Sequence, residues 1–159
     1  MKYSILFVFI FLFASLSYGQ QLKKLKIDEL EAYINKSEKP LLVNFWATFC
    51  IPCVEELPYF QSIIKEKYNE NVDLLLVSLD LPSYYPDRIT SFMAAKKISA
   101  TSVWLNESNA DLFCPRIDKS WEGTIPASLF VNNKKKYRKF HEGQLTPAML
   151  KKELETLTK

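Results

Sequence analysis

The chain of 159 residues is long enough for one domain with a hydrophobic core, and its formal net charge of +3 gives no reason to expect a nucleic-acid partner. It contains only 3 cysteines, too few for a small domain held together by disulfides. Burial of apolar side chains therefore has to hold the fold together.

The N-terminal segment, residues 1–19, has the features of a secretory signal peptide. Lys2 supplies a positive charge, an apolar run covers residues 5–16, and the small residues Ser17 and Gly19 precede a predicted cleavage after Gly19. The run is short of the roughly 20 residues that a membrane span needs, although an uncleaved anchor facing the periplasm stays open as the alternative. Without Lys2 the net charge falls from +3 to +2. Export would place the chain in the periplasm, an oxidising compartment where disulfides persist.

The rest of the chain is predicted to form a short polar lead over residues 20–27 and one domain over residues 28–159. Asp28 is the predicted N-cap of a first helix, because Glu31 follows three residues later and apolar residues recur at helical spacing. Residues 41–46 then form a nearly unbroken apolar run, which is typical of a strand buried on both faces.

The next patterns predict a βαβ unit. Residues 50–68 have helical periodicity, with a kink expected at Pro58, and residues 72–79 form a second apolar run. Two buried strands joined by a helix imply a right-handed crossover in a parallel sheet.

The second half of the chain predicts shorter elements that complete an α/β domain. They are a helix from Asp87 to about Lys97, a strand over 102–105, an irregular segment over 108–118 interrupted by Pro115, an antiparallel hairpin of strands over 125–131 and 137–141, and a last helix opened by Thr146 and Pro147. The basic residues between 134 and 139 are interpreted as a solvated turn that protects a sheet edge from pairing. A docking site for an acidic partner is the alternative.

The chemistry of the chain is predicted to reside in Cys50-Ile51-Pro52-Cys53, which follows a strand and opens a helix. A helix N-terminus stabilises a thiolate and can lower the pKa of a thiol to roughly 3.5–7.5. Cys50, the more exposed of the two, is the predicted nucleophile, and Cys53, one turn deeper, would resolve the mixed disulfide. A zinc site is disfavoured because the only other cysteine and the only histidine are far along the chain. We therefore expect no metal and no cofactor besides the cysteine pair.

The segment 44–58 resembles the active-site segment of the TlpA/ResA-like branch of the thioredoxin superfamily, and Thr124-Ile125-Pro126 resembles that family's cis-proline loop. The resemblance extends from about Asp28 to the C-terminus. It implies a thioredoxin-like α/β fold, whose mixed central sheet combines the parallel βαβ unit with the C-terminal antiparallel hairpin and carries helices on both faces. It also implies an extracytoplasmic thiol-disulfide oxidoreductase.

The same resemblance assigns roles to individual residues. Pro126 would be cis and pack against the disulfide, and the backbone of Ile125 would pair with a partner chain. Glu56 would carry protons for Cys53, with which it shares a helix face; an ordinary acid favoured by the helix dipole, or Glu55 in the same role, is the alternative. The predicted partner-binding residues are Trp46, Phe49, Ile51, Pro52, Trp121, Ile125 and Pro126.

The chain also departs from the family pattern. Asn44 stands where cytoplasmic thioredoxins carry a buried aspartate, and Phe49 replaces a common tryptophan. Cys114 lies outside the motif and is interpreted as a buried apolar thiol, with a third redox group as the alternative. His141 is expected to be structural or solvated.

The sequence thus predicts an exported, monomeric enzyme that exchanges disulfides with protein partners, more readily as a reductant than as an oxidant. The resemblance implies apocytochrome c or other exported proteins as partners and a membrane electron donor upstream. The alternative from another class is a redox-inert peptide-binding module, in which Cys50 and Cys53 form a static disulfide beside Pro126. The presence of both cysteines together with Pro126 favours the enzyme, because a pure binding module need not keep all three.

Overall fold

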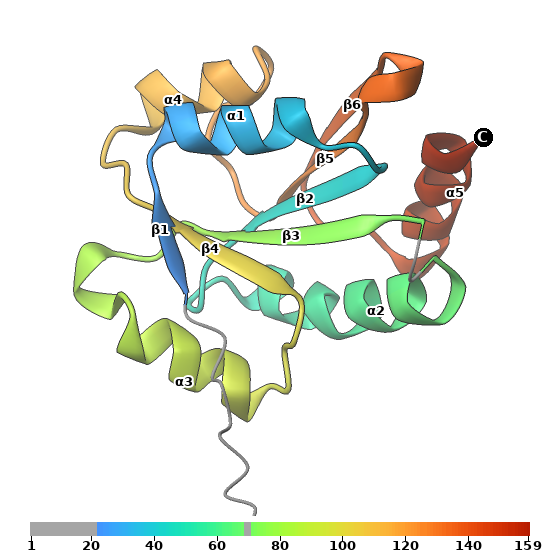
Figure 1. Cartoon of the computed structure of the whole chain (residues 1–159). Helices are drawn as coiled ribbons and strands as arrows, with labels where there is room; N and C mark the ends of the chain where they lie inside the picture. Colours follow the sequence, from blue (N-terminus) through green and yellow to red (C-terminus); the bar gives the residue numbers. More distant parts are fainter. Residues whose placement is uncertain (1–21, 69–70) are drawn as a thin grey trace, which may run out of the picture.

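The computed structural model describes residues 22–68 and 71–159, so the predicted signal segment 1–19 lies outside the described residues (Figure 1). The strands are β1 (Lys23–Leu25), β2 (Leu41–Trp46), β3 (Asp73–Ser78), β4 (Thr101–Leu105), β5 (Ala127–Asn132) and β6 (Tyr137–Glu142). The helices are α1 (Ile27–Lys36), α2 (Ile51–Lys67), α3 (Asp87–Ala95), α4 (Ala110–Ile117) and α5 (Pro147–Thr158), and short 3-10 turns cover Pro82–Tyr84 and Asn133–Lys135.

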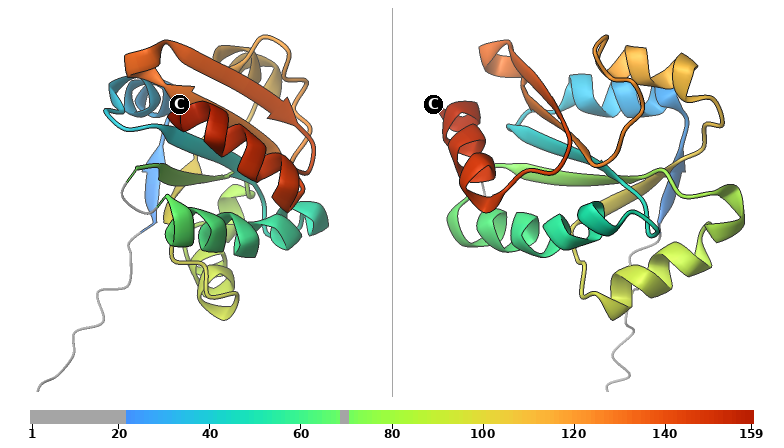
Figure 2. Two further views of the ribbon diagram at one scale, coloured as in Figure 1. Left: turned by 90° about the vertical axis from the view of Figure 1, so that its right-hand side faces the viewer. Right: turned by 180° about the vertical axis from the view of Figure 1, so that it is seen from behind.

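The strands form one mixed sheet in the order β1-β4-β3-β2-β5-β6. Strands β1, β4, β3 and β2 are parallel to one another, whereas β5 runs antiparallel to both β2 and β6. Helices α1 and α4 cover one face of the sheet, and α2, α3 and α5 cover the other (Figures 1 and 2). The chain therefore has the predicted thioredoxin-like α/β architecture.

Strand β2 lies in the middle of the sheet and is buried along its whole length. Val43 and Phe45 point into the core beneath α1 and α4, and Leu42 and Trp46 point into the cores on the opposite face. Alternating side chains enter apolar cores on both faces, which explains why the segment reads as a continuous apolar run.

Two predictions at the start of the domain were wrong. The expected polar lead contains strand β1, whose Lys23 and Leu25 lie opposite Val103 and Leu105 of β4. Its three side chains are exposed or half-buried, so this edge strand leaves no apolar pattern in the sequence. Helix α1 begins at Ile27 and not after Asp28, because the predicted cap is already in the first turn.

The irregular segment predicted around Pro115 is instead helix α4. The side chain of Asn109 accepts a hydrogen bond of 3.0 Å from the Asp111 N–H and caps the helix. Phe113, Cys114 and Ile117 are buried in the core between α4, α1 and the sheet. Packing of this apolar face offsets the single backbone hydrogen bond that a proline removes.

The C-terminal predictions are confirmed. Strand β6 is an edge strand, and Lys134, Lys135 and Lys136 lie exposed in the turn before it. That these lysines protect the sheet edge from pairing stays a prediction. Thr146 caps α5 through a hydrogen bond of 3.3 Å from the Met149 N–H.

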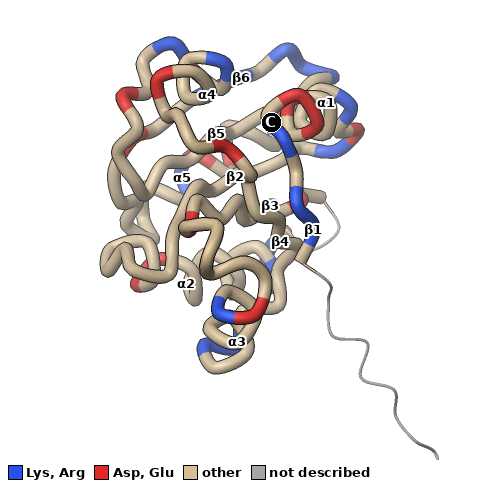
Figure 3. The backbone as a smooth tube through the Cα atoms, turned by 90° about the vertical axis from the view of Figure 1, so that its left-hand side faces the viewer, with Lys and Arg blue, Asp and Glu red and all other residues tan. Residues whose placement is uncertain are grey.

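Lysine and arginine positions are interspersed with aspartate and glutamate positions over the surface (Figure 3).

One side chain in the hairpin turn secures the end of α1. The Asn133 amide nitrogen lies 2.9 Å from the carbonyl oxygen of Ile34, 3.2 Å from that of Asn35 and 3.0 Å from that of Ser37. These carbonyls lie at the C-terminal end of α1, where the Ile34 carbonyl also accepts the Ser37 N–H at 3.3 Å, so the amide adds a donor for acceptors that the helix itself does not fully satisfy.

We expect Asn133→Ala to lower the free energy of unfolding by about 1 kcal/mol, the usual net value of such hydrogen bonds. Urea denaturation of the oxidised protein measures it. Lys134→Ala, at the exposed neighbouring position, should change stability by less than about 0.5 kcal/mol. Equal effects of the two substitutions would contradict the capping role.

Candidate active site

The two cysteines lie where β2 meets α2, at the carboxyl end of the central strand. Cys50 is the N-cap of α2 and forms a disulfide with Cys53, with 5.3 Å between their Cα atoms. Cys50 is 9% exposed, whereas Cys53 is fully buried at 0%. Cys50 is therefore the less buried of the two cysteines and the one that another molecule can reach more readily.

Backbone groups surround the Cys50 sulfur. The Cys53 N–H donates a hydrogen bond of 3.3 Å to Cys50 Sγ, and the Ile125 carbonyl oxygen lies 3.7 Å from the same sulfur. The Ile125–Pro126 peptide bond is cis. In the reduced state the Cys53 N–H and the N-terminus of α2 both favour a thiolate at Cys50, because each places positive charge near the sulfur.

The loop before Cys50 is held by a buried carboxylate that sequence reasoning missed. Asp80, 4% exposed, accepts hydrogen bonds from the Thr48 N–H at 3.0 Å, the Thr48 hydroxyl at 2.6 Å and the Ser78 hydroxyl at 2.8 Å. The sequence did contain a signal for this contact. Asp80 directly follows β3, and the carboxyl ends of neighbouring parallel strands meet at one edge of a sheet, so Asp80 could be expected near the loop that follows β2.

A second buried carboxylate, Glu56, lies on α2 one turn beyond Cys53. Its side chain accepts hydrogen bonds from the Asn44 amide at 2.7 Å and from the Leu145 N–H at 3.1 Å. Burial raises the pKa of Glu56 to about 7, and these two hydrogen bonds partly oppose the rise. Glu55, the alternative proton carrier, is exposed.

The sequence showed that Asn44 stands where cytoplasmic thioredoxins carry an aspartate, but it did not show which groups the Asn44 side chain binds. Its amide donates to Glu56 and, at 3.2 Å, to the Ser128 hydroxyl. The segment after β6 was also missed: Gln144 donates to the Pro52 carbonyl at 3.2 Å, and the Tyr59 hydroxyl donates to the Leu145 carbonyl. The contacts of Gln144 and Leu145 join residues 86 or more positions apart, so no local pattern signals them.

The predicted partner-binding residues fall into exposed, half-buried and buried groups. Phe49 and Ile51 are 58% and 73% exposed and flank Cys50 in the sequence. Trp46 and Trp121 are instead buried, at 0% and 3% exposure. Pro52 and Ile125 are half-buried and Pro126 is buried. The tryptophans thus form the core beneath the site, and the smaller set around Cys50 offers the accessible surface.

The remaining cysteine is separate from this pair. Cys114 is 2% exposed in the core beneath α4. Burial, together with the negative charges of Glu142 and Asp111, raises the pKa of its thiol to about 11. It is therefore protonated at neutral pH, as expected of a buried apolar thiol. Among residues 22–68 and 71–159, no group of three or more His, Cys, Asp or Glu side chains is arranged to hold a metal ion.

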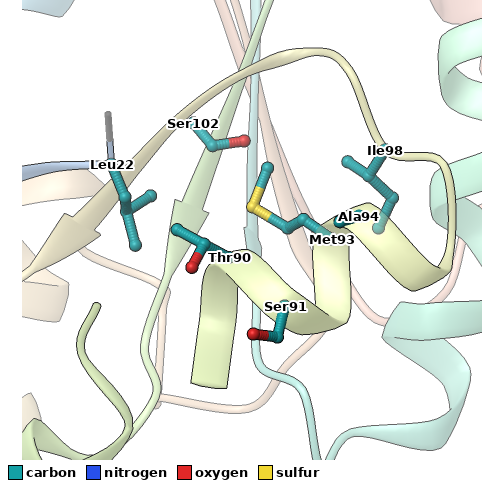
Figure 4. Close-up of a pocket in the computed structure, with 7 residues that line it drawn as sticks. All are labelled: Leu22, Thr90, Ser91, Met93, Ala94, Ile98 and Ser102. Carbon is teal, nitrogen blue, oxygen red and sulfur yellow. The ribbon is translucent and has the colours of Figure 1, made fainter. Parts of the chain in front are cut away.

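A pocket of about 390 Å³, which neither Cys50 nor Cys53 lines, lies between α3 and the sheet (Figure 4). Thr90 and Met93 of α3 face Leu22 and Ser102 across it. Its lining residues carry hydroxyls and apolar groups but no thiol, carboxylate or imidazole, so it contains no group suited to redox or acid–base chemistry.

A disulfide at the N-terminus of the helix after the central strand, beside a cis proline, defines the class of protein. This chain is an enzyme of the thiol-disulfide oxidoreductase class with a thioredoxin fold. A family model described as the AhpC/TSA family matches residues 19–139, and the chain belongs to that family.

Curated relatives agree with this class. The chain is 31% identical to "Sporulation thiol-disulfide oxidoreductase A" of Bacillus subtilis, over 74% of this chain and 67% of the relative. It is 38% identical to "Thiol-disulfide oxidoreductase ResA" of Oceanobacillus iheyensis, over 38% of this chain and 33% of that one. The matched part is thus a third to two thirds of the length of these relatives.

Solved structures resemble the chain over most of its length. A thioredoxin-related protein from Neisseria meningitidis serogroup B has a TM-score of 0.65 at 23% identity, covering 76% of this chain and 86% of that one. StoA from Bacillus subtilis has a TM-score of 0.56 at 25% identity, covering 78% and 85%. The first comparison supports the fold alone.

Within the described part of the chain, no helix combines the length and the apolar character needed to cross a bilayer.

We expect the buried carboxyl of Glu56 to make stability depend on pH. Its pKa is about 7 in the folded protein against an ordinary value of 4.5, so between these two pH values the folded state holds a proton that the unfolded chain has released. The free energy of unfolding therefore falls as pH rises through this window, by up to about 3 kcal/mol.

Urea denaturation of the oxidised protein at both ends of that window measures the effect. Glu56→Gln cannot titrate, so its stability relative to wild type should rise by about 1–3 kcal/mol from the acidic to the alkaline end. Glu55→Gln, which alters an exposed neighbour, should show no such change. A constant difference between Glu56→Gln and wild type would rule out the raised pKa.

Proposed function

We propose that this chain is an exported enzyme that reduces disulfides in protein partners through Cys50 and Cys53. One observation carries the proposal: Cys50 Sγ is the accessible sulfur at the N-terminus of α2, accepts the Cys53 N–H at 3.3 Å and lies 3.7 Å from the carbonyl oxygen of Ile125. The Cys50 sulfur thus lies beside both the groups that would stabilise its thiolate and the backbone with which a partner chain could pair.

The exchange takes two steps. The Cys50 thiolate attacks one sulfur of a partner disulfide, which forms a mixed disulfide and releases the other partner sulfur as a thiolate. The Cys53 thiolate then attacks Cys50 Sγ, which forms the Cys50–Cys53 disulfide and releases the second partner sulfur. Two electrons pass to the partner, and the two protons lost by the cysteines end on its two thiols.

Glu56 is suited to accept the proton of Cys53 before the second step. The two residues are three positions apart on α2, so their Cβ atoms lie roughly 5–6 Å apart, and both are fully buried. A carboxyl with a pKa of about 7 is half ionised near neutral pH, which is the condition under which a group can both take up and release a proton.

The same carboxylate favours the reducing direction. A strongly oxidising cysteine pair owes its potential to a stabilised reduced form. Negative charge on buried Glu56 opposes a thiolate at Cys53, so it stabilises the disulfide relative to a reduced pair in which Cys53 is ionised. The pair is then the stronger reductant.

The location and the partners of the enzyme belong to this proposal as well. The features of residues 1–19 support export to the periplasm, with membrane anchorage by an uncleaved segment as the alternative. Partners would be exported protein disulfides, apocytochrome c among them, and a membrane donor would return electrons to a monomeric enzyme. The name of the Oceanobacillus relative, a thiol-disulfide oxidoreductase, supports the chemistry and not a particular partner.

Trapping of the mixed disulfide tests the exchange. Reduced Cys53→Ser should form a stable mixed disulfide with an oxidised protein such as insulin, because the resolving thiol is absent. Cys50→Ser should trap little, because Cys53 is fully buried. Non-reducing gels and mass spectrometry measure the adduct. If neither variant forms one and the wild-type disulfide resists glutathione and dithiothreitol, the chain is a static binding module and not an exchanger.

The reduction potential tests the direction. We expect a wild-type value near that of thioredoxin, about −270 mV, in thiol-alkylation titrations against dithiothreitol. At a pH above 7, Glu56→Gln should raise the potential by roughly 30 mV, a tenfold change in equilibrium constant, because the charge opposing the thiolate is removed. Glu55→Gln serves as the control. A wild-type potential near −120 mV would identify an oxidant instead.

A further inference from the structure

We propose that Trp121 and Glu142 are positioning residues that hold Thr124 so that the backbone of Ile125 is presented to an extended partner chain. The inference rests on the proposed exchange with protein partners and adds two residues to its machinery. The sequence position of Trp121 predicts a direct contact with the partner. Its ring is buried, so we assign it a positioning role instead.

Both backbone groups of Thr124 are bound by side chains of the protein itself. The Thr124 N–H donates a hydrogen bond of 3.0 Å to the Glu142 carboxylate, and the Thr124 carbonyl accepts one of 2.9 Å from the Trp121 indole N–H. Thr124 precedes Ile125 directly, so these two bonds set the direction in which the chain enters the cis peptide bond.

Each of the two side chains has a firm support. The Trp121 ring is 3% exposed and packs against Phe45, Phe113 and Phe140, with ring centroids 4.5, 5.9 and 5.6 Å away. Glu142 lies opposite Ala127 in the β5–β6 ladder. The loop is therefore tied to the aromatic core on one side and to the sheet edge on the other.

Two further contacts fix the ends of the loop. The Gly143 N–H donates a hydrogen bond of 2.8 Å to the Pro126 carbonyl. Gly123 has a φ of +93°, a backbone conformation that side-chain-bearing residues rarely adopt, so the glycine lets the loop turn before Thr124.

Ile125 is left as the residue with a usable backbone edge. In the described ranges 22–68 and 71–159, no hydrogen bond engages the Ile125 N–H, and its carbonyl oxygen faces Cys50 Sγ at 3.7 Å. A partner whose cysteine meets Cys50 can therefore pair its own backbone with Ile125 as an added strand segment. Because Thr124 is already satisfied, the pairing register is restricted to Ile125.

Two probes that share the same leaving group distinguish backbone pairing at Ile125 from the disulfide chemistry at Cys50. The first is a ten-residue peptide with a central cysteine joined to thionitrobenzoate by a disulfide, and the second is cysteamine joined to the same group. Attack by reduced Cys50 releases the coloured thionitrobenzoate from both probes, but only the peptide carries a backbone that can pair with Ile125. Second-order rate constants under single-turnover conditions measure both reactions.

For Glu142→Ala and for Trp121→Phe we expect the peptide rate to fall about tenfold, the effect of losing about 1.4 kcal/mol of binding, while the cysteamine rate stays within about twofold. Glu142→Gln keeps a side-chain oxygen that can accept the Thr124 N–H, so it should restore most of the peptide rate. The reduction potential should stay at the wild-type value in all three.

Two control variants remove comparable groups that make no hydrogen bond to Thr124. Glu153→Ala removes a carboxylate that bonds Lys139 of β6 at 2.6 Å, and Trp104→Phe removes an indole N–H donated to the Asp80 carbonyl at 2.8 Å. Both should leave the ratio of the two rates unchanged. Thermal unfolding of every variant checks that it is folded.

Three results would overturn the inference alone: unchanged peptide rates in the two variants, equal losses with both probes, or the same loss in the controls. A wild-type protein that releases no thionitrobenzoate from either probe would overturn the proposed exchange activity itself.

Discussion

The hydrogen bonds around the buried carboxyl of Glu56 are the interaction on which the arrangement of the site depends. Asn44 brings the central strand to this carboxyl, and the Leu145 N–H brings the segment after the last strand. A polar group buried this deeply is tolerated only with partners, so its burial obliges β2, α2 and the β6–α5 connection to stay together. Cys53 lies one turn away on the same helix and shares that environment.

The two sulfur atoms are placed by different means. Cys53 is enclosed by the core between β2 and α3, and Cys50 is placed by backbone groups of α2 and of the loop before Pro126. Asp80 secures the approach to Cys50 by holding Thr48. The Cys50 sulfur therefore has a defined position although it lies in a connection between two elements, and thiol-disulfide exchange requires such a position.

Much of the fold could be predicted because its central elements have strong local signals. The buried strands β2 and β3 read as apolar runs, α2 and α5 as amphipathic patterns, and Thr146 as a cap. Strand β1 could not be predicted, since a three-residue edge strand buries little and is recognisable only through β4. Helix α4 was missed because a proline signals interruption locally, whereas packing of Phe113 and Ile117 overrides that signal.

Within the site the division is similar. The sequence by itself determined where the cysteine pair lies, and it predicted the order of nucleophile and resolving cysteine and the roles of Pro126 and Glu56, because all of these follow from spacing along one chain segment or from a recognisable motif. Only the tertiary structure decided that Asn44 and Leu145 hold that acid, that Asp80 holds Thr48, and that Trp121 lies in the core and binds Thr124 instead of contacting solvent. The physical reason is that burial and hydrogen bonding between distant segments depend on how the sheet brings them together, and residue spacing alone does not encode this.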